Sequence, residues 1–233
     1  MASQPHTTAM WEQARDCIAA TEEHPFLMSM LDGSLAMPNF QFYIIQDSHY
    51  LSRFGAALRL LGEKENFSEE EKAALRGFAD GADFAERGLH DSFFKSWHKQ
   101  VTDVEPCPNN LLYTSYLTTV VVTENYAEGL AVLLPCFWVY MHVGQRLLAS
   151  RAASSAKRAE EYDRWIDMYG GEEFGKAVMA YRAMVEKAAE ASDQATRERM
   201  SKHFVKCCEL EWMFWAAAVD MQEWPTYPPA PKP

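Results

Sequence analysis

The sequence predicts an all-α protein built as a single-domain helical bundle, and three observations lead to this prediction. Apolar residues recur at helical spacing along most of the chain. No two alternating segments are joined by the turn residues of a β-hairpin, and no repeat of about 20 to 50 residues is visible. The 233 residues can bury one sizeable core, so we expect one domain.

Three helices are expected in the first quarter of the chain. The first covers about Thr8 to Thr21, and the second covers His24 to Leu31 and stops before the Asp32-Gly33 pair. The fixed φ of Pro38 suits the first turn of a helix, so a third helix begins there and ends near Gly62.

The middle of the chain contains two long helical segments. Ser68, followed three residues later by Glu71, forms a capping-box sequence that opens a helix reaching about Lys99 through Phe78, Phe84, Leu89 and Phe93. A proline-containing loop follows over 101–109. From Asn110 a helical region continues to Leu148, and Pro135 bends it because proline removes a backbone hydrogen bond.

The last third begins with a polar turn over 152–157, and Gly170-Gly171 separates two of its helices. Ser192 is a suitable cap for the last helix. The proline-rich tail cannot continue a helix, so we expect residues 1–223 to form the domain and 224–233 an extended tail. The three helices expected here are Arg158 to Met168, Glu172 to Glu190, and Asp193 to Val219.

Composition limits the partners and the compartment. The net charge of -11 disfavours binding to a phosphate backbone, so we expect no nucleic-acid partner. The longest apolar stretch, Gly129 to Met141, is too short to span a membrane and contains Pro135, and the N-terminus lacks a signal or transit sequence. The five cysteines have no metal-finger spacing and are odd in number, which favours free thiols in a reducing compartment. These features predict a cytoplasmic protein with no membrane partner.

One thiol and two acids form the candidate site. Cys136 follows Pro135 and precedes two aromatic residues, so it lies where a helix bends and frees backbone groups. Asp47 and Glu211 each interrupt an apolar helical stripe and therefore point toward the core. The stripes are Phe40, Tyr43, Ile44, Asp47, Tyr50, Leu51, Phe54, Leu58, Leu61 and Phe204, Cys207, Cys208, Glu211, Phe214, Trp215, Ala218.

Buried acids and a buried thiol also have structural explanations. A lone cysteine is more often a small core residue, and a single inward acid can be a satisfied structural group. Two inward acids together with an aromatic-flanked thiol favour a functional site.

A metal site is a weaker alternative. Glu86 and His90 lie four apart on one helical face, as in half of a di-iron site, but His98, His142 and His203 have no acid three residues away to complete it. The sequence also lacks a nucleophile elbow and a glycine-rich phosphate loop. We therefore expect no metal and no cofactor.

Several motifs together resemble the TenA family, also called thiaminase II. The resemblance covers about Trp11 to Trp224 and implies an all-α fold like that of haem oxygenase without haem, a homotetramer, and hydrolysis of aminopyrimidines derived from thiamin. The motifs are His24-Pro-Phe, Asp32-Gly33-Ser-Leu, Tyr43-Ile-Ile-Gln-Asp47-Ser-His-Tyr50-Leu, Asn125-Tyr-Ala-Glu, Leu134-Pro-Cys136-Phe-Trp, Trp165-Ile-Asp-Met-Tyr169 and Glu211-Trp-Met-Phe-Trp215.

The resemblance implies a role for each candidate catalytic residue. Cys136 resembles the nucleophile that adds to the pyrimidine ring. Glu211 resembles the acid that shares a proton with a ring nitrogen, and Asp47 resembles the acid that holds the exocyclic amine. Among the substrate-binding residues, Tyr113 and Tyr169 resemble hydroxyl donors near the thiol and the leaving group, and Tyr50 resembles a wall of the ring pocket.

The resemblance also implies a substrate. Cys136 is characteristic of the branch that converts 4-amino-5-aminomethyl-2-methylpyrimidine to the hydroxymethyl pyrimidine, with thiamin a slower substrate. His142 stands where the family often has an acid, and the proline-rich tail is outside the family pattern. Two alternatives remain: a pyrimidine-binding regulatory protein and a di-iron oxygenase on the same fold.

Overall fold

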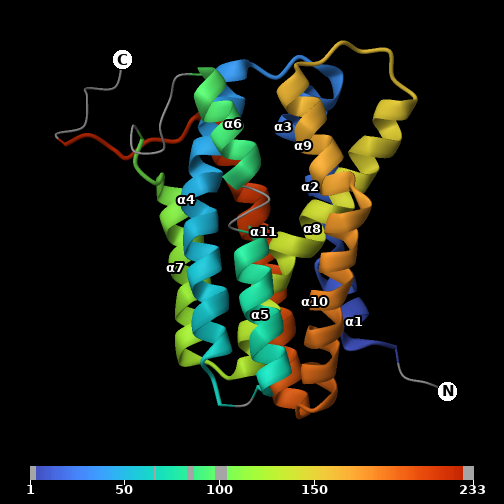
Figure 1. The fold of residues 1–233 in the computed structure, drawn as a ribbon, viewed down its shortest axis with the longest axis vertical. Coiled ribbons are helices and arrows are strands. Elements are labelled where there is room, and N and C mark those ends of the chain that lie inside the picture. The colour runs from blue at the N-terminus through green and yellow to red at the C-terminus, as the bar shows by residue number, and fades with distance from the viewer. Residues whose placement is uncertain (1–3, 66, 83–86, 98–103, 228–233) are drawn as a thin grey trace.

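The computed structural model describes residues 4–65, 67–82, 87–97 and 104–227, and in these ranges it contains eleven helices and no strand (Figure 1). The prediction of an all-α fold is confirmed. The helices are α1 (His6–Gln13), α2 (Arg15–Glu22), α3 (Pro25–Asp32), α4 (Met37–Gly62), α5 (Glu69–Gly81), α6 (Arg87–Trp97), α7 (Pro108–Thr123), α8 (Tyr126–Ala152), α9 (Glu160–Gly170), α10 (Glu172–Glu190) and α11 (Gln194–Asp220).

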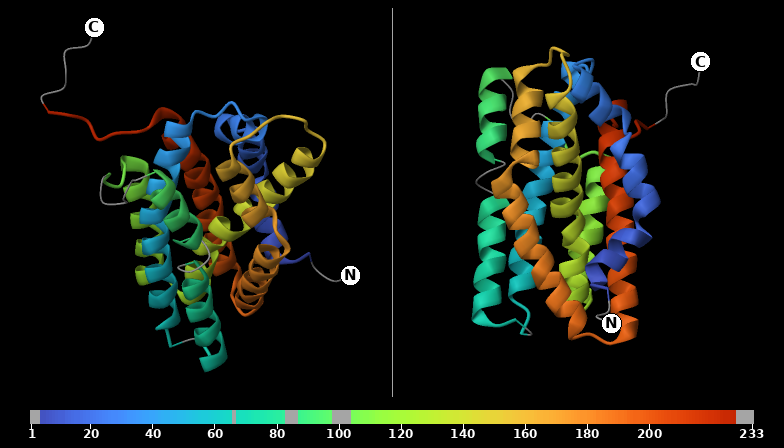
Figure 2. Two further views of the ribbon diagram at one scale, coloured as in Figure 1. Left: turned by 45° about the horizontal axis from the view of Figure 1, so that its top comes forward. Right: turned by 90° about the vertical axis from the view of Figure 1, so that its right-hand side faces the viewer.

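Helix α8 is the central element of the bundle. It packs against α7, α9, α10 and α11, and α4 packs against both α5 and α7. Helices α1 and α2 lie along α11 (Figure 2). Among the described helices only α8 has the length and apolar composition of a membrane span, but 89% of its most apolar window is buried inside the bundle. Its apolar surface therefore forms the core.

The first expected helix is two helices in the structure. Ala14 separates α1 from α2 with φ -90° and ψ 0°, and its N–H lies within hydrogen-bond distance of both the Met10 and the Trp11 carbonyls. This local tightening ends α1, and α2 begins one residue later.

The helix expected from Ser68 to Lys99 corresponds to α5 and α6 in the structure. Its capping box is present: the Ser68 N–H donates to Glu71 Oε2 at 2.8 Å, and the Glu71 N–H donates to Ser68 Oγ at 3.3 Å. Helix α5 ends at Gly81 and α6 begins at Arg87. Phe84, expected in the middle of one long helix, lies outside the described residues.

The region expected to run unbroken from Asn110 to Leu148 is also two helices. The Asn125 side chain accepts hydrogen bonds from the backbone N–H groups of Ala127 and Glu128, at 3.0 and 3.1 Å, and so caps α8. The break thus falls at the cap, whereas Pro135 lies inside α8, which continues through it.

The cap of α11 is Asp193, not Ser192. The Asp193 carboxylate accepts from the Thr196 N–H at 2.7 Å, whereas the Ser192 hydroxyl donates to the Ala188 carbonyl at the end of α10. Both residues are cap formers, and the structure uses the one nearer the helix.

Glycine allows α8 and α9 to approach closely beside the candidate site. A Cβ atom on Gly144 would lie 2.4 Å from the Tyr169 carbonyl carbon and 2.6 Å from the Gly170 nitrogen, both of which belong to backbone. Because backbone cannot rotate away, only glycine fits at Gly144. This contact sets the position of Tyr169 on α9.

We expect Gly144→Ala to lower the free energy of unfolding by about 1 to 3 kcal/mol, because the added methyl overpacks the interface between two helices. Thermal unfolding measures the change. The matched control is Gly88→Ala in α6, where the residue is exposed and an added Cβ meets nothing within 4 Å. Equal melting temperatures for the two variants would contradict the close-contact argument.

Candidate active site

The structure places the six candidate residues on five helices. Asp47 and Tyr50 are on α4, and Tyr113, Cys136, Tyr169 and Glu211 are on α7, α8, α9 and α11, respectively. All six are buried; Cys136 is the most accessible, with 9% of its surface exposed, and Glu211 has 1% exposed. Every other member of the two apolar stripes is buried as well. Both acids therefore face the interior, as their spacing predicts.

Glu211 and Tyr113 form the central hydrogen bond of the site. The Tyr113 hydroxyl donates to Glu211 Oε1 at 2.7 Å. Burial raises the pKa of Glu211 to about 8; the hydrogen bond from Tyr113 opposes this shift, and the charge of Asp47 adds to it. At neutral pH the Glu211 carboxyl is therefore mainly protonated, and it can donate a proton to a bound base.

The Cys136 thiol lies in the same cluster. Burial raises the pKa of Tyr50 well above its ordinary value, and charge on Cys136 and Glu211 raises it further. Tyr113 has a pKa raised by burial and by the charges of Glu211, Tyr50, Cys207 and Cys136. The thiol, two phenols and the acid are thus close enough to affect one another, and both phenols remain protonated donors at neutral pH.

Aromatic rings enclose this cluster. The Tyr50 ring centroid lies 4.9 Å from that of Tyr113, 5.7 Å from that of Phe54, on which it stacks, and 5.7 Å from that of Phe214. A flat apolar ring can be held by such surroundings. This arrangement is consistent with the expectation that Tyr50 forms a wall of a ring pocket.

Tyr169 packs among aromatic residues of α8, α9 and α10. Its ring lies 4.9 Å from Tyr140, 4.6 Å from Trp165 and 5.2 Å from Phe174. Burial raises the pKa of Tyr140, and charges on Tyr43, Glu211, Asp47 and Tyr169 add to the shift. Tyr140 therefore packs against Tyr169 and lies close enough to both acids for their charges to affect its pKa.

Tyr140 was not among the residues singled out from the sequence, and its neighbours Tyr43 and Trp165 were named there without a role in the site. The Tyr43 hydroxyl lies 3.4 Å from the Tyr140 hydroxyl and accepts a hydrogen bond from Trp165 Nε1 at 3.1 Å. Tyr140 follows Cys136 by four residues, so helical spacing could have placed it on the same face of α8. The contact with Trp165 joins helices distant in sequence and has no local signal.

The described histidines form pairs that do not involve the buried cluster. His142 Nε2 lies 2.6 Å from Glu22 Oε1, and His203 Nδ1 lies 2.8 Å from the Tyr116 hydroxyl. In the described part of the chain no group of three or more His, Cys, Asp and Glu side chains is placed to hold a metal ion. The expected Glu86–His90 pair and His98 lie outside the described side chains.

The fold and the buried cluster define the class of protein as a helical bundle of the haem oxygenase-like type, with a thiol and two acids inside it. A solved domain of unknown function with a heme oxygenase-like fold from Shewanella denitrificans OS217 superimposes with a TM-score of 0.70 over 92% of this chain and 90% of that chain, at 13% identity. This similarity concerns the fold alone.

The chain belongs to the TENA/THI-4/PQQC family, whose model matches residues 11–221. It is 31% identical over 204 residues, 86% of this chain and 84% of the relative, to a Bacillus subtilis (strain 168) protein named aminopyrimidine aminohydrolase. The solved TenA homologue from P. horikoshii OT3 has a TM-score of 0.83 and 23% identity, over 92% of this chain and 98% of that chain. The resemblance noted from the motifs is thus confirmed.

Proposed function

We propose that this protein is an aminopyrimidine aminohydrolase of thiamin salvage. It is a hydrolase of C–N bonds that converts 4-amino-5-aminomethyl-2-methylpyrimidine to 4-amino-5-hydroxymethyl-2-methylpyrimidine and also hydrolyses thiamin. The observation that carries this proposal is the convergence of Cys136, Glu211, Tyr113 and Tyr50 in one buried cluster. The similarity to the B. subtilis aminopyrimidine aminohydrolase supports it.

The cluster can perform the reaction by covalent catalysis. Glu211 donates its proton to a ring nitrogen, which makes the ring an electron acceptor. The sulfur of Cys136 then bonds to a ring carbon, and the thiol proton passes to the departing amine. As the C–N bond breaks, ammonia leaves and the electrons of the ring form a double bond to the methylene carbon.

Water completes the reaction by the reverse sequence. Its oxygen adds to the methylene carbon, the C–S bond breaks, the sulfur recovers a proton from that water, and the ring proton returns to Glu211. The net change is one water consumed and one ammonia released. Asp47 holds the exocyclic amine of the ring, Tyr50 forms a ring wall, and the Tyr113 and Tyr169 hydroxyls donate near the thiol and the leaving group.

Product analysis tests this function. Purified protein is incubated separately with the aminomethyl pyrimidine and with thiamin, and the hydroxymethyl pyrimidine is quantified. Formation of this product from the aminomethyl pyrimidine supports the proposal. Tight binding of the pyrimidine without turnover would favour a regulatory protein, and activity that requires iron would favour a di-iron oxygenase.

The same proposal places residues 1–223 in one domain, requires no cofactor and locates the enzyme in the cytoplasm. The family model supports the domain because it matches residues 11–221. All five cysteines are free thiols, which is consistent with a reducing compartment.

We expect a homotetramer in solution. Helix α7 presents Leu111, Leu112 and Val122 with 49%, 52% and 59% of their surfaces exposed, which is apolar area that an assembly could cover. Light scattering should give a mass near four times the 26.6 kDa of one chain. A mass near that of a single chain would contradict the expectation.

A further inference from the structure

Hydrogen bonds at three levels join α7 to α11 and to the segment that follows α11. The contacting residues of α7 are four and three positions apart, so they share one face of that helix. Their partners run in the opposite order along the chain, so the two helices are antiparallel and the Tyr113–Glu211 pair lies between the other two. The pairs are the Asn109 N–H with Gln222 Oε1 at 2.9 Å, the Tyr113 hydroxyl with Glu211 Oε1 at 2.7 Å, and the Tyr116 hydroxyl with His203 Nδ1 at 2.8 Å.

The start of α7 depends on acceptors from elsewhere in the chain. Pro108, its first residue, has no N–H, and Cys107 caps the helix without a side-chain hydrogen bond. The N–H of Asn109 comes next, has no acceptor within the helix, and belongs to a residue with 2% of its surface exposed. Gln222 supplies the acceptor for this N–H, and Gln46 on α4 supplies the acceptor for the Cys107 N–H, also at 2.9 Å.

A sharp turn after α11 directs Gln222 toward α7. Met221 has φ 45° and ψ 56°, a left-handed conformation that is unfavourable for residues other than glycine. Among the described residues it is the one non-glycine residue with a positive φ. The Gln222 N–H donates to the Ala217 carbonyl at 2.9 Å. Asn39 Nδ2 on α4 donates to the Ala218 carbonyl at 2.9 Å, so the turn is fixed by both α11 and α4.

Trp224 adds a second contact to the same region. Its Nε1 donates to the Pro106 carbonyl at 2.8 Å, two residues before α7 begins. The segment 222–224, which we call the strap, therefore lies beside the start of α7 (Figure 1). The match to the family model ends at residue 221, so the strap lies outside the matched residues.

We propose that the strap positions Tyr113 on Glu211, so that Gln222 and Trp224 are positioning residues for the reaction. The inference rests on the proposed function and goes beyond it. Asn109 and Tyr113 are one turn apart, so a shift at the start of α7 moves the Tyr113 hydroxyl relative to α11. Without the Gln222 acceptor the Asn109 N–H is buried and unpaired, which is costly, so the start of α7 shifts to find another partner.

The pKa of Glu211 reports the geometry of its pair with Tyr113. The hydrogen bond from Tyr113 lowers this pKa against the effect of burial, so a longer bond moves it further above its value of about 8. Of the groups that face Glu211, none belongs to the strap, so Gln222→Ala changes no charge among them. These groups are Asp47 and Tyr50 on α4, Tyr113 on α7, Tyr140 on α8, Cys17 on α2, and Cys207 and Cys208 on α11.

We expect Gln222→Ala to lower kcat for the aminomethyl pyrimidine by about threefold to tenfold, because small displacements of reacting groups slow catalysis. The fall in activity at high pH should move upward by about half a pH unit or more, because the Tyr113 bond no longer holds the Glu211 pKa down. Normal kcat would overturn the inference. A loss of kcat without the shift in pH dependence would show a merely structural role and would overturn it as well.

The conservative variant Gln222→Glu should restore both values toward wild type, because it keeps an oxygen acceptor for the Asn109 N–H. Its added charge acts weakly on Glu211, since the helix from Glu211 to Asp220 is about 14 Å long and the screening length is about 8 Å at physiological ionic strength. Failure to restore either value would contradict the proposed role of the acceptor.

Two more variants test the rest of the strap. Trp224→Phe keeps an aromatic ring and removes the donor to the Pro106 carbonyl, so it should change kcat and the pH dependence in the same direction as Gln222→Ala. Glu223→Ala is the matched control, because this side chain is exposed and makes neither contact; it should match wild type. Melting temperatures establish that the variants are folded. Equal changes in Glu223→Ala and Gln222→Ala would overturn the inference.

Unfolding experiments separate failure of the inference from failure of the proposed function, because they need no substrate. Melting temperatures are measured from about pH 6 to about pH 10 in wild type and Gln222→Ala, each with and without Glu211→Gln. The difference within each pair gives the contribution of Glu211, which decreases with pH until its folded-state pKa is passed. This decrease should end at a higher pH in Gln222→Ala.

The two kinds of measurement have separate outcomes. If wild type turns over neither the aminomethyl pyrimidine nor thiamin, the proposed function fails, and the melting temperatures still test the strap. A decrease that ends at a higher pH in Gln222→Ala supports positioning of Tyr113 by the strap, and a decrease that ends at the same pH as in wild type overturns it.

Discussion

The Cys136→Ser variant is expected to remain folded and to lose turnover by roughly a hundredfold or more, because a hydroxyl is a far weaker nucleophile than a thiolate at neutral pH. Serine is slightly smaller than cysteine, so packing around the residue, which has 9% of its surface exposed, changes little. Steady-state rates with the aminomethyl pyrimidine measure turnover, and a melting curve shows whether the variant is folded.

Another buried thiol supplies the matched control. Cys208 lies on α11 and has 1% of its surface exposed. The proposed mechanism gives it no role. Cys208→Ser makes the same chemical change and should retain normal turnover on its folded fraction. A nearly normal rate for Cys136→Ser would refute covalent catalysis.

Alkylation gives an independent measure of the same thiol. Burial raises the pKa of Cys17 to about 11 and also raises the pKa of Cys107, so both should react slowly. Cys136 should be modified faster than either, and substrate should protect it. Mass spectrometry showing equal labelling of the three cysteines would count against an activated site.

Local sequence signals predicted most of the helices because capping and periodicity are properties of neighbouring residues. The Ser68–Glu71 box and the Pro38 start are present. The breaks at Asn125 and Ala14 also have local causes, but their sequence signals are weak. Asn125 caps a helix between two strongly apolar segments, and Ala14 has no turn-forming side chain. Apolar periodicity continued across both positions and concealed the breaks.

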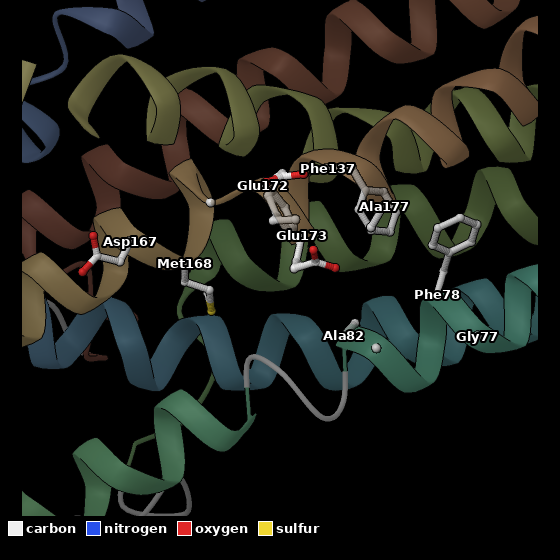
Figure 3. A pocket seen from close by; sticks show the side chains of 12 residues that line it. Gly77, Phe78, Ala82, Phe137, Asp167, Met168, Glu172, Glu173 and Ala177 are labelled. Atoms are coloured by element: carbon white, nitrogen blue, oxygen red, sulfur yellow. The ribbon is translucent and has the colours of Figure 1, made fainter. Parts of the chain in front are cut away.

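The inward positions of Asp47 and Glu211 were predictable because each acid interrupts an otherwise apolar stripe. Tertiary partners were not predictable in the same way. The bond from Tyr113 to Glu211 joins α7 to α11, and the Tyr43 hydroxyl meets Tyr140 and Trp165 only after α4, α8 and α9 pack together. The Phe78 and Phe137 rings, 5.8 Å apart, likewise join α5 to α8 (Figure 3), and no short motif signals this contact.

The Glu211→Gln variant is expected to lose turnover by roughly two to four orders of magnitude, because an amide cannot give a proton to the ring nitrogen. The amide oxygen can still accept the hydrogen bond from Tyr113, so the geometry of the site is preserved. In wild type, activity should fall as pH rises past about 8, where the buried carboxyl loses its proton. The residual activity of the Glu211→Gln variant should not show this fall at high pH.

Stability should change in the opposite direction from activity. The pKa of Glu211 is about 8 in the folded state, against an ordinary value of 4.5, so between these values the folded protein holds a proton that the unfolded chain releases. The contribution of Glu211 to the free energy of unfolding of the wild type is therefore greatest below pH 4.5 and decreases as pH rises through about 8. Glutamine has no proton to lose, so the variant should unfold at a higher temperature than wild type at pH 8.

Glu128 distinguishes a structural acid from a catalytic one. It is as buried as Glu211, with 1% of its surface exposed, but Arg199 Nε lies 2.7 Å from its Oε1 and Asn125 donates to its Oε2. Glu128→Gln leaves Arg199 without its charged partner, so it should lower stability and retain turnover on the folded fraction. Glu211→Gln should show the reverse pattern, because its wild-type carboxyl is protonated and pairs with a neutral hydroxyl. A destabilised but active Glu211→Gln variant would mean that this carboxyl is structural and that the ring proton comes from elsewhere.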